Sequence, residues 1–204
     1  MKDVHGPTAP AARIAAAPPP APIVPSLSAV IPVYNSAESL PILVSRLQPV
    51  LAVASEVYEV ILVNDCSVDQ SWKVIQELSR NHEWVRGVCL MRNYGQHNAL
   101  LCGIRNARCD TIVTLDDDLQ HPPEEIPKLL CKLQEGFDVV YGAPEQQQHG
   151  LWRDLSSALT KVALQSSMGV DTARQVSAFR VFRTQLREAF ANYHSPFISL
   201  DVVL

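Results

Sequence analysis

The sequence lacks the long apolar run that a membrane-spanning helix requires. No stretch reaches the roughly 18 consecutive apolar residues that cross a bilayer, and no compact apolar core follows basic residues at the N-terminus, as it would in a secretory signal. The glycine motifs G-x-G-x-x-G and G-x-x-x-x-G-K-[ST] are also missing. Their absence argues against a dinucleotide-binding domain and against a P-loop nucleotide hydrolase.

Cysteine pairs are lacking as well. The chain has 5 cysteines, scattered and without a C-x-x-C pair. An odd, dispersed set argues against a disulfide framework and against a structural zinc site. We expect free thiols in a reducing compartment, most of them small core residues.

A basic excess is lacking too, because the net charge is −4. No nucleic-acid partner is therefore expected. The charge is unevenly spread: residues 1–150 carry 11 Lys and Arg against 17 Asp and Glu, whereas residues 151–190 carry 6 against 3. The later segment is the better candidate to meet an anionic partner.

The first part of the chain has few large apolar side chains. Residues 1–26 hold 7 of the 15 prolines, and alanine fills much of the rest. This composition is typical of an unpacked, polyproline-like segment. We predict a disordered tail over 1–26 and one domain over 27–204, which stops inside an apolar run and is therefore expected to be incomplete at its C-terminus.

What is present is a regular succession of strands and helices. Short β-branched runs alternate with helical patterns, which predicts an α/β fold: a mostly parallel, Rossmann-like sheet with helices on both faces. Asn35 and Asp69 are expected to cap the first two helices, and Ala99 and Gly103 to let the third approach the sheet closely. The strands are expected over 27–33, 57–63, 84–90, 110–115, 137–141 and 176–182, and the helices over 36–53, 69–80, 95–107 and 122 onward, with a helical stripe over 151–162.

Polar residues follow four of these strands. Tyr34-Asn35, Asn64-Asp65, Arg92-Asn93 and Asp116-Asp117-Asp118 each stand at a strand end. In parallel sheets ligands bind beyond the carboxyl ends of the strands, so a nucleotide site is expected there. Strand alternation would point Asp116 and Asp118 the same way and Asp117 the other. Two carboxylates on one side suit Mg²⁺ or Mn²⁺, completed by substrate phosphates.

Four segments of the chain contain motifs that can be compared with those of known families: Ile31–Asn35, Val63–Ser67, Leu115–Glu124 and Arg92–His97. Ile31–Asn35 resembles the first-strand signature of family 2 glycosyltransferases of the GT-A fold, and Val63–Ser67 resembles their Asp-Gly-Ser turn, with Cys66 in place of a frequent Gly. Leu115–Glu124 is very similar to the version in dolichol-phosphate mannosyltransferases and bacterial polyprenyl-phosphate sugar transferases. Arg92–His97 resembles the undecaprenyl-phosphate aminoarabinose transferase branch.

The resemblance implies roles for individual residues. The implied nucleotide-binding residues are Pro32, Val33, Tyr34, Asn35, Asp65, Asp116 and Asp117, with Asp65 at the base. The implied metal ligands for Mg²⁺ or Mn²⁺ are Asp116, Asp118 and Gln120. The implied catalytic residues are Asp116, Asp118, Arg153 and Arg180, with the two arginines at the acceptor phosphate.

The implied reaction moves a sugar, with inversion, from a nucleoside diphosphate sugar to a polyprenyl phosphate. An anionic phosphate acceptor needs no general base, whereas a hydroxyl acceptor does. The enzyme would work in the cytoplasm, at the inner membrane face in its full-length form. Two alternatives stay open: transfer to a saccharide hydroxyl with Asp201 as base, and a non-catalytic nucleotide-sugar-binding fragment. A D-x-D-x-T phosphatase is disfavoured because Gln120 occupies the Thr position.

Overall fold

The computed structural model describes residues 23–142 and 178–190. Arg153, Asp201 and the expected helical stripe over 151–162 lie outside these ranges. The helices and strands are β1 (Val24–Val33), α1 (Ser39–Ala54), β2 (Ser55–Asn64), α2 (Ser71–Asn81), β3 (Val85–Cys89), α3 (Gln96–Asn106), β4 (Thr111–Thr114), the 3₁₀ helix η1 (Pro123–Glu125), α4 (Ile126–Gln134), β5 (Val139–Tyr141), β6 (Arg180–Arg183) and the 3₁₀ helix η3 (Thr184–Phe190).

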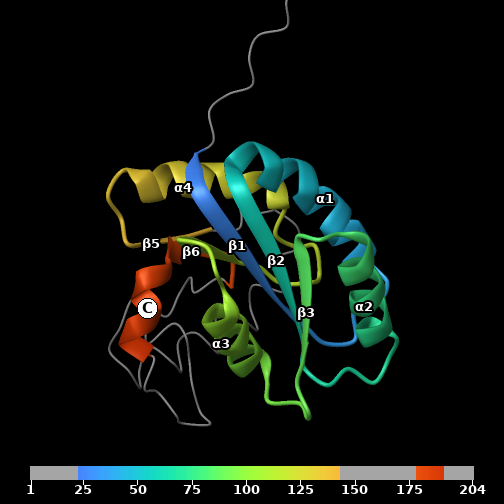
Figure 1. Cartoon of the computed structure of the whole chain (residues 1–204). Coiled ribbons are helices and arrows are strands. Elements are labelled where there is room, and N and C mark those ends of the chain that lie inside the picture. Colours follow the sequence, from blue (N-terminus) through green and yellow to red (C-terminus); the bar gives the residue numbers. More distant parts are fainter. Residues whose placement is uncertain (1–22, 143–177, 191–204) are drawn as a thin grey trace, which may run out of the picture.

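The six strands form one sheet in the order β3-β2-β1-β4-β6-β5 (Figure 1). β1 pairs in parallel with both β2 and β4, and β2 pairs in parallel with β3. Among the strands in the described ranges, only the pairs of β6, with β4 and with β5, are antiparallel. The predicted mostly parallel sheet is therefore confirmed. The chain places β2 and β3 on one side of β1 and β4 on the other, so the order reverses between β1 and β4, where α/β sheets bind ligands.

Helices cover both faces of the sheet, as predicted. On one face, alternate residues of β1 such as Ala29 and Ile31 pack in a core cluster with α1, α2 and α4. On the other face, Val30 and Ile61 pack against α3, which lies apart from the other three helices in Figure 1. Strands covered on both sides need apolar residues at successive positions, which explains the apolar runs over 29–33 in β1 and 60–63 in β2.

The close approach of α3 to the sheet is confirmed at Gly103. A Cβ atom at this position would collide with a methyl group of Val30 and lie 3.1 Å from one of Val63. Ala99, one turn earlier, is also fully buried. Small side chains at these two positions therefore set the distance between α3 and the strands β1 and β2.

Two local predictions are wrong. Asn35 does not cap α1: its φ is 56°, and α1 begins at Ser39, preceded by Glu38 without a side-chain cap. The side-chain oxygen of Asn35 instead accepts the backbone N–H of Val68 at 2.9 Å. The predicted tail over 1–26 is too long, because residues 24–26 begin β1. Asp69 accepts the N–H of Ser71 at 2.9 Å, but the N-cap residue of α2 is Gln70, which makes no side-chain cap.

The described helices also bear on membrane insertion. Within residues 23–142 and 178–190, no helix is both long enough and apolar enough to cross a bilayer.

Candidate functional site

A cavity of about 330 Å³ opens at the carboxyl ends of the parallel strands. It lies where the order of the sheet reverses, between the ends of β1 and β4. The predicted strand-end residues converge there, together with the start of α3. The lining residues are Pro32, Val33, Tyr34, Asp65, Asn93, Gly95, Gln96, Asp116, Asp117 and Asp118. Of the predicted site residues in the described ranges, Asn35, Gln120 and Arg180 do not line it.

Three turns around the cavity contain a left-handed residue that is not glycine. Asn35 follows β1 with a φ of 56°, Cys66 follows β2 with a φ of 56°, and Leu119 follows β4 with a φ of 63°. This conformation costs an L-residue about 1–2 kcal/mol, and such residues cluster at functional sites. Hydrogen bonds between the turns offset the cost: the N–H of Asn35, for example, donates to Ser67 Oγ at 3.0 Å. The turns are therefore held together rather than independent.

Asp117 does not point away from the other two carboxylates, so that prediction is wrong. β4 ends at Thr114, and the alternation of side chains along a strand does not continue into the turn that follows. Asp117 lines the same cavity as Asp116 and Asp118. Its Oδ2 accepts the backbone N–H of Tyr34 at 3.2 Å, so Asp117 joins the β4 turn to the end of β1.

The carboxylates at the end of β4 are crowded. The pKa of Asp116 is raised, first by burial and then by the charge of Asp118, while His121 and a hydrogen bond from Gln96 oppose the shift. The pKa of Asp117 is raised as well, mainly by burial. No salt bridge of the described residues joins any of the three Asp side chains to a Lys or Arg. Uncompensated oxygen donors of this kind fit a divalent cation such as Mg²⁺ or Mn²⁺.

The number of protein ligands for such an ion is small. No cluster of three or more His, Cys, Asp or Glu that could hold a metal is found in the described ranges. Gln120, a predicted ligand, is exposed, and its backbone N–H donates to Asp118 Oδ1 at 3.0 Å. A site in which Asp116 and Asp118 hold an ion together with substrate phosphates, as is usual for Mg²⁺, stays a prediction.

Asp65 is engaged in a way that sequence reasoning missed. Its side chain is buried, and its two oxygens accept the backbone N–H groups of Tyr94 at 2.7 Å and of Gly95 at 2.8 Å. Gln96 was missed as well: its Nε2 donates to Asp116 Oδ1 at 2.6 Å. The family resemblance of Arg92–His97 drew attention to this segment but gave Gln96 no role.

Arg180 lies inside the protein, not in the cavity. Its side chain is 1% exposed, its Nε donates to Thr114 Oγ1 at 3.3 Å, and its Cζ lies 5.9 Å from the ring centroid of Tyr141. Thr114 Oγ1 in turn donates to the carbonyl of Ala178 at 2.5 Å. In this arrangement Arg180 fastens β6 beside the end of β4, and its contact with an acceptor phosphate stays a prediction.

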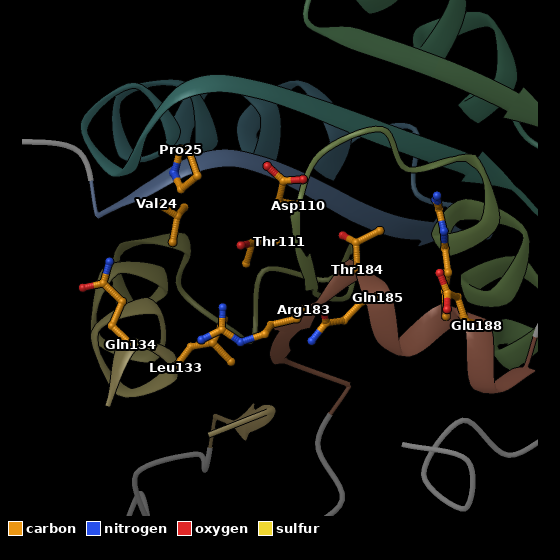
Figure 2. A pocket seen from close by; sticks show the side chains of 11 residues that line it. Val24, Pro25, Asp110, Thr111, Leu133, Gln134, Arg183, Thr184, Gln185 and Glu188 are labelled. Atoms are coloured by element: carbon orange, nitrogen blue, oxygen red, sulfur yellow. The ribbon is translucent and has the colours of Figure 1, made fainter. Parts of the chain in front are cut away.

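A cavity of about 420 Å³ lies at the opposite edge of the sheet. Figure 2 shows Asp110 and Thr111, at the start of β4, on one side of it and Arg183, at the end of β6, on another. This is the amino edge of the parallel strands, away from the switch point where ligands of such sheets bind. Its charged lining residues are two of each sign: Asp110, Glu188, Arg183 and Arg187. The smaller cavity is therefore the candidate active site.

The sequence of the chain matches the family model "Glycosyl transferase family 2" over residues 28–191. The chain belongs to this family. All the elements from β1 to η3 fall within the match except the first four residues of β1.

Relatives with names refine the comparison. Undecaprenyl-phosphate 4-deoxy-4-formamido-L-arabinose transferase of Yersinia enterocolitica is 38% identical over 169 residues, which cover 82% of this chain and 52% of the relative. The enzyme of that name from Pseudomonas aeruginosa is 40% identical over 164 residues, which cover 80% of this chain and 48% of the relative. The family 2 chain described here thus spans about half the length of these relatives.

Solved structures of GT-A glycosyltransferases share the fold. The solved chain of S. aureus TarS, residues 1–349, superposes with a TM-score of 0.59 at 18% identity, covering 87% of this chain and 53% of that one. Glucosyl-3-phosphoglycerate synthase of Mycobacterium tuberculosis, solved with Mn²⁺, UDP-glucose and phosphoglyceric acid, also gives a TM-score of 0.59 at 18% identity, covering 81% of this chain and 59% of the synthase. The predicted GT-A fold is confirmed.

Proposed function

We propose that this chain contains the sugar-nucleotide site of an inverting, metal-dependent glycosyltransferase that acts on a polyprenyl phosphate. The observation that carries the proposal is the meeting of Asp65, Asp116, Asp117 and Asp118 in one cavity at the switch point of the sheet. The base of a nucleoside diphosphate sugar can donate a hydrogen bond to a carboxylate. Its pyrophosphate can bind a cation. The cavity offers groups for both.

The residues divide the work as follows. Asp65 and the backbone around Pro32 to Tyr34 would bind the nucleoside. Asp117 would keep Tyr34 in place by accepting the backbone N–H of Tyr34. Asp116 and Asp118 would hold Mg²⁺ or Mn²⁺. When bound, the cation would supply positive charge against the negative charge that grows on the leaving pyrophosphate.

The proposed acceptor is a polyprenyl phosphate. Relatives whose names specify undecaprenyl phosphate cover most of this chain at about 38% identity, and residues 151–190 carry 6 Lys and Arg against 3 Asp and Glu. Arg153 and Arg180 are the proposed contacts of the acceptor phosphate. A phosphate oxygen is already anionic at neutral pH, so the acceptor needs no general base. The reaction would take place at the inner face of the membrane in the full-length protein.

Metal-dependent nucleotide binding is the first test. Titration calorimetry with Mn²⁺ and with UDP-, GDP- and dTDP-sugars should detect binding that a chelator abolishes and that Asp118→Ala weakens about 10-fold or more. The exposed Glu77→Ala on α2 is the matched control. Binding that neither the chelator nor Asp118→Ala affects would rule out the metal role.

The acceptor needs a separate assay. A full-length protein that contains this chain would receive labelled nucleotide sugar with either polyprenyl phosphate or soluble saccharides. We expect transfer to the lipid phosphate and loss of transfer in Arg153→Ala. Transfer to saccharide hydroxyls alone, with Arg153→Ala active and Asp201→Ala inactive, would instead support the saccharide transferase.

A further inference from the structure

One short segment links Asp65 to Asp116 across the cavity. Asp65, 3% exposed, accepts the backbone N–H groups of Tyr94 and Gly95 at 2.7 and 2.8 Å. The next residue, Gln96, begins α3, and its Nε2 donates to Asp116 Oδ1 at 2.6 Å. The carboxylate after β2 and the carboxylate after β4 are thus joined through three successive residues.

We propose that Gln96 is a positioning residue for the candidate metal site and that Asp65 positions Gln96. The inference rests on the proposed metal-dependent binding of a sugar nucleotide. It adds that the nucleoside end and the cation end of the cavity are coupled, because the carboxylate assigned to the nucleoside also holds the segment that orients a metal ligand.

The peptide that Asp65 holds is hydrogen-bonded to the first turn of α3. Gly95 has φ 87° and ψ 156°, a region that is open to glycine and closed to other residues. A Cβ at Gly95 would meet nothing within 4 Å, so the backbone conformation, not space, requires glycine there. The carbonyl of Gly95 accepts the N–H groups of Asn98 and Ala99 at 3.0 and 3.1 Å. The first turn of α3, and with it Gln96, therefore follows the peptide that Asp65 holds.

Glutamine has the chemistry that this position needs. Its amide is a neutral donor, so it can fix one oxygen of Asp116 without cancelling the charge that attracts a cation. A lysine at this place would form an ion pair with Asp116 and compete with the metal. Groups that hydrogen-bond to ligating carboxylates orient the ligands, and their loss typically costs about 10- to 100-fold in metal affinity.

The link has a thermodynamic consequence. A nucleoside that donates a hydrogen bond to Asp65 would weaken the bonds that Asp65 accepts from the N–H groups of Tyr94 and Gly95. The bond from Gln96 to Asp116 would change in turn. Linkage then requires that the cation changes nucleotide affinity by the same factor as the nucleotide changes cation affinity. Removing the amide of Gln96 should reduce this factor, and the part that remains would come from direct contact between the cation and the pyrophosphate.

Manganese binding tests the positioning role. Gln96→Met keeps the length of the side chain and removes its donor, and Gln76→Met makes the same change on the exposed face of α2. Free Mn²⁺ measured by electron paramagnetic resonance, without nucleotide, should show about 10-fold weaker binding for Gln96→Met and unchanged binding for Gln76→Met. Asp65→Asn should also weaken Mn²⁺ binding in the absence of nucleotide, which a role confined to the nucleoside would not produce. Thermal melting of each variant checks that the fold is retained.

A spectroscopic measurement tests the link without any metal. The NMR signal of the Gln96 side-chain amide, identified by its loss in Gln96→Met, should shift in both Asp116→Ala and Asp65→Asn. A signal that responds to neither variant would overturn the link. Wild-type protein that binds Mn²⁺ no better than Gln96→Met would overturn the positioning role alone, whereas wild-type protein that binds no Mn²⁺ even with a nucleoside diphosphate sugar present would overturn the proposed metal-dependent function as well.

Discussion

At the scale of single residues, the site combines conformations and charges that the fold alone does not favour. Cys66 has a φ of 56° where glycine would be free of strain, and Asp116 is held close to Asp118 with a raised pKa. Natural proteins keep such features where function needs them. For each of these two features we predict that a substitution that removes it does not destabilise the ligand-free protein.

Cys66→Gly should leave the free energy of unfolding unchanged or raise it by up to about 1 kcal/mol. Glycine removes a left-handed penalty of about 1–2 kcal/mol and adds about 0.5–1 kcal/mol of backbone entropy to the unfolded state. Cys131→Gly, on the exposed face of α4, is the matched control and should lose about 0.5 kcal/mol. Urea unfolding measures both. A loss at position 66 as large as the loss at 131 would contradict the prediction.

Asp116→Asn should raise the melting temperature of the ligand-free protein while it abolishes Mn²⁺ binding. Burial and the neighbouring charge of Asp118 disfavour the ionised carboxylate, and asparagine keeps an oxygen that can accept from Gln96. We expect a rise of about 2–4 °C, measured by calorimetry with a chelator present. In saturating Mn²⁺ the order should reverse, because only the wild type gains from binding. A lower melting temperature in chelator would contradict the assigned crowding.

At the scale of elements, sequence predicted the strands better than the turns. Strands buried on both faces need continuous apolar runs, so the second halves of β1 and β2 stand out from composition alone. The turns depend on tertiary contacts. Asn35 accepts the N–H of Val68 instead of capping α1. The alternation of side chains that predicted the direction of Asp117 ends with β4 at Thr114. The local rules failed at two of the three turns around the cavity, those after β1 and β4, where contacts between loops outweigh local preference.

Glu59 on β2 joins three elements, and Glu59→Gln should destabilise the fold by about 3 kcal/mol. Its carboxylate accepts from Ser28 Oγ on β1 at 2.8 Å, from Arg86 Nη1 on β3 at 2.7 Å and from the N–H of Arg108 before β4 at 2.7 Å. Burial alone would raise the pKa of Glu59, but these bonds outweigh it and lower the pKa. Urea unfolding at neutral pH measures the loss.

The pH dependence gives Glu59 an independent check. A carboxyl group whose pKa is lower in the folded state stabilises the fold above its unfolded pKa, and this stabilisation is lost as the pH falls through the folded pKa. The difference between wild type and Glu59→Gln should therefore shrink below about pH 4. Glu135→Gln, which removes an exposed pair with Lys132, is the control and should cost less than about 1 kcal/mol. A pH-independent difference would contradict the assignment.

At the scale of the whole molecule, the location of the site could be predicted from the sequence, but the hydrogen bonds between its residues could not. Alternating strands and helices imply a parallel sheet, and such a sheet brings its strand ends to one edge, so polar residues at four strand ends predict one cavity. The bonds from Asp65 to the Tyr94-Gly95 peptide and from Gln96 to Asp116 depend on how the loop after β3 meets the turn after β4. No local pattern specifies that meeting.

The boundary between the N-terminal segment and the domain gives the last prediction. Residues 1–22 consist largely of proline, alanine and small side chains, whereas Val24 and Ser26 pair with Ser55 and Val57 of β2. Ser26 Oγ also donates to Asp110 Oδ2 at 2.9 Å and accepts the N–H of Asp110 at 2.8 Å. Deleting residues 2–22 should leave the melting temperature nearly unchanged, whereas deleting residues 2–26 should lower it by several degrees, since about 1 kcal/mol shifts it by about 2–4 °C. Calorimetry of the two deletions decides, and an equal loss in both would show that the segment before Ile23 packs on the domain.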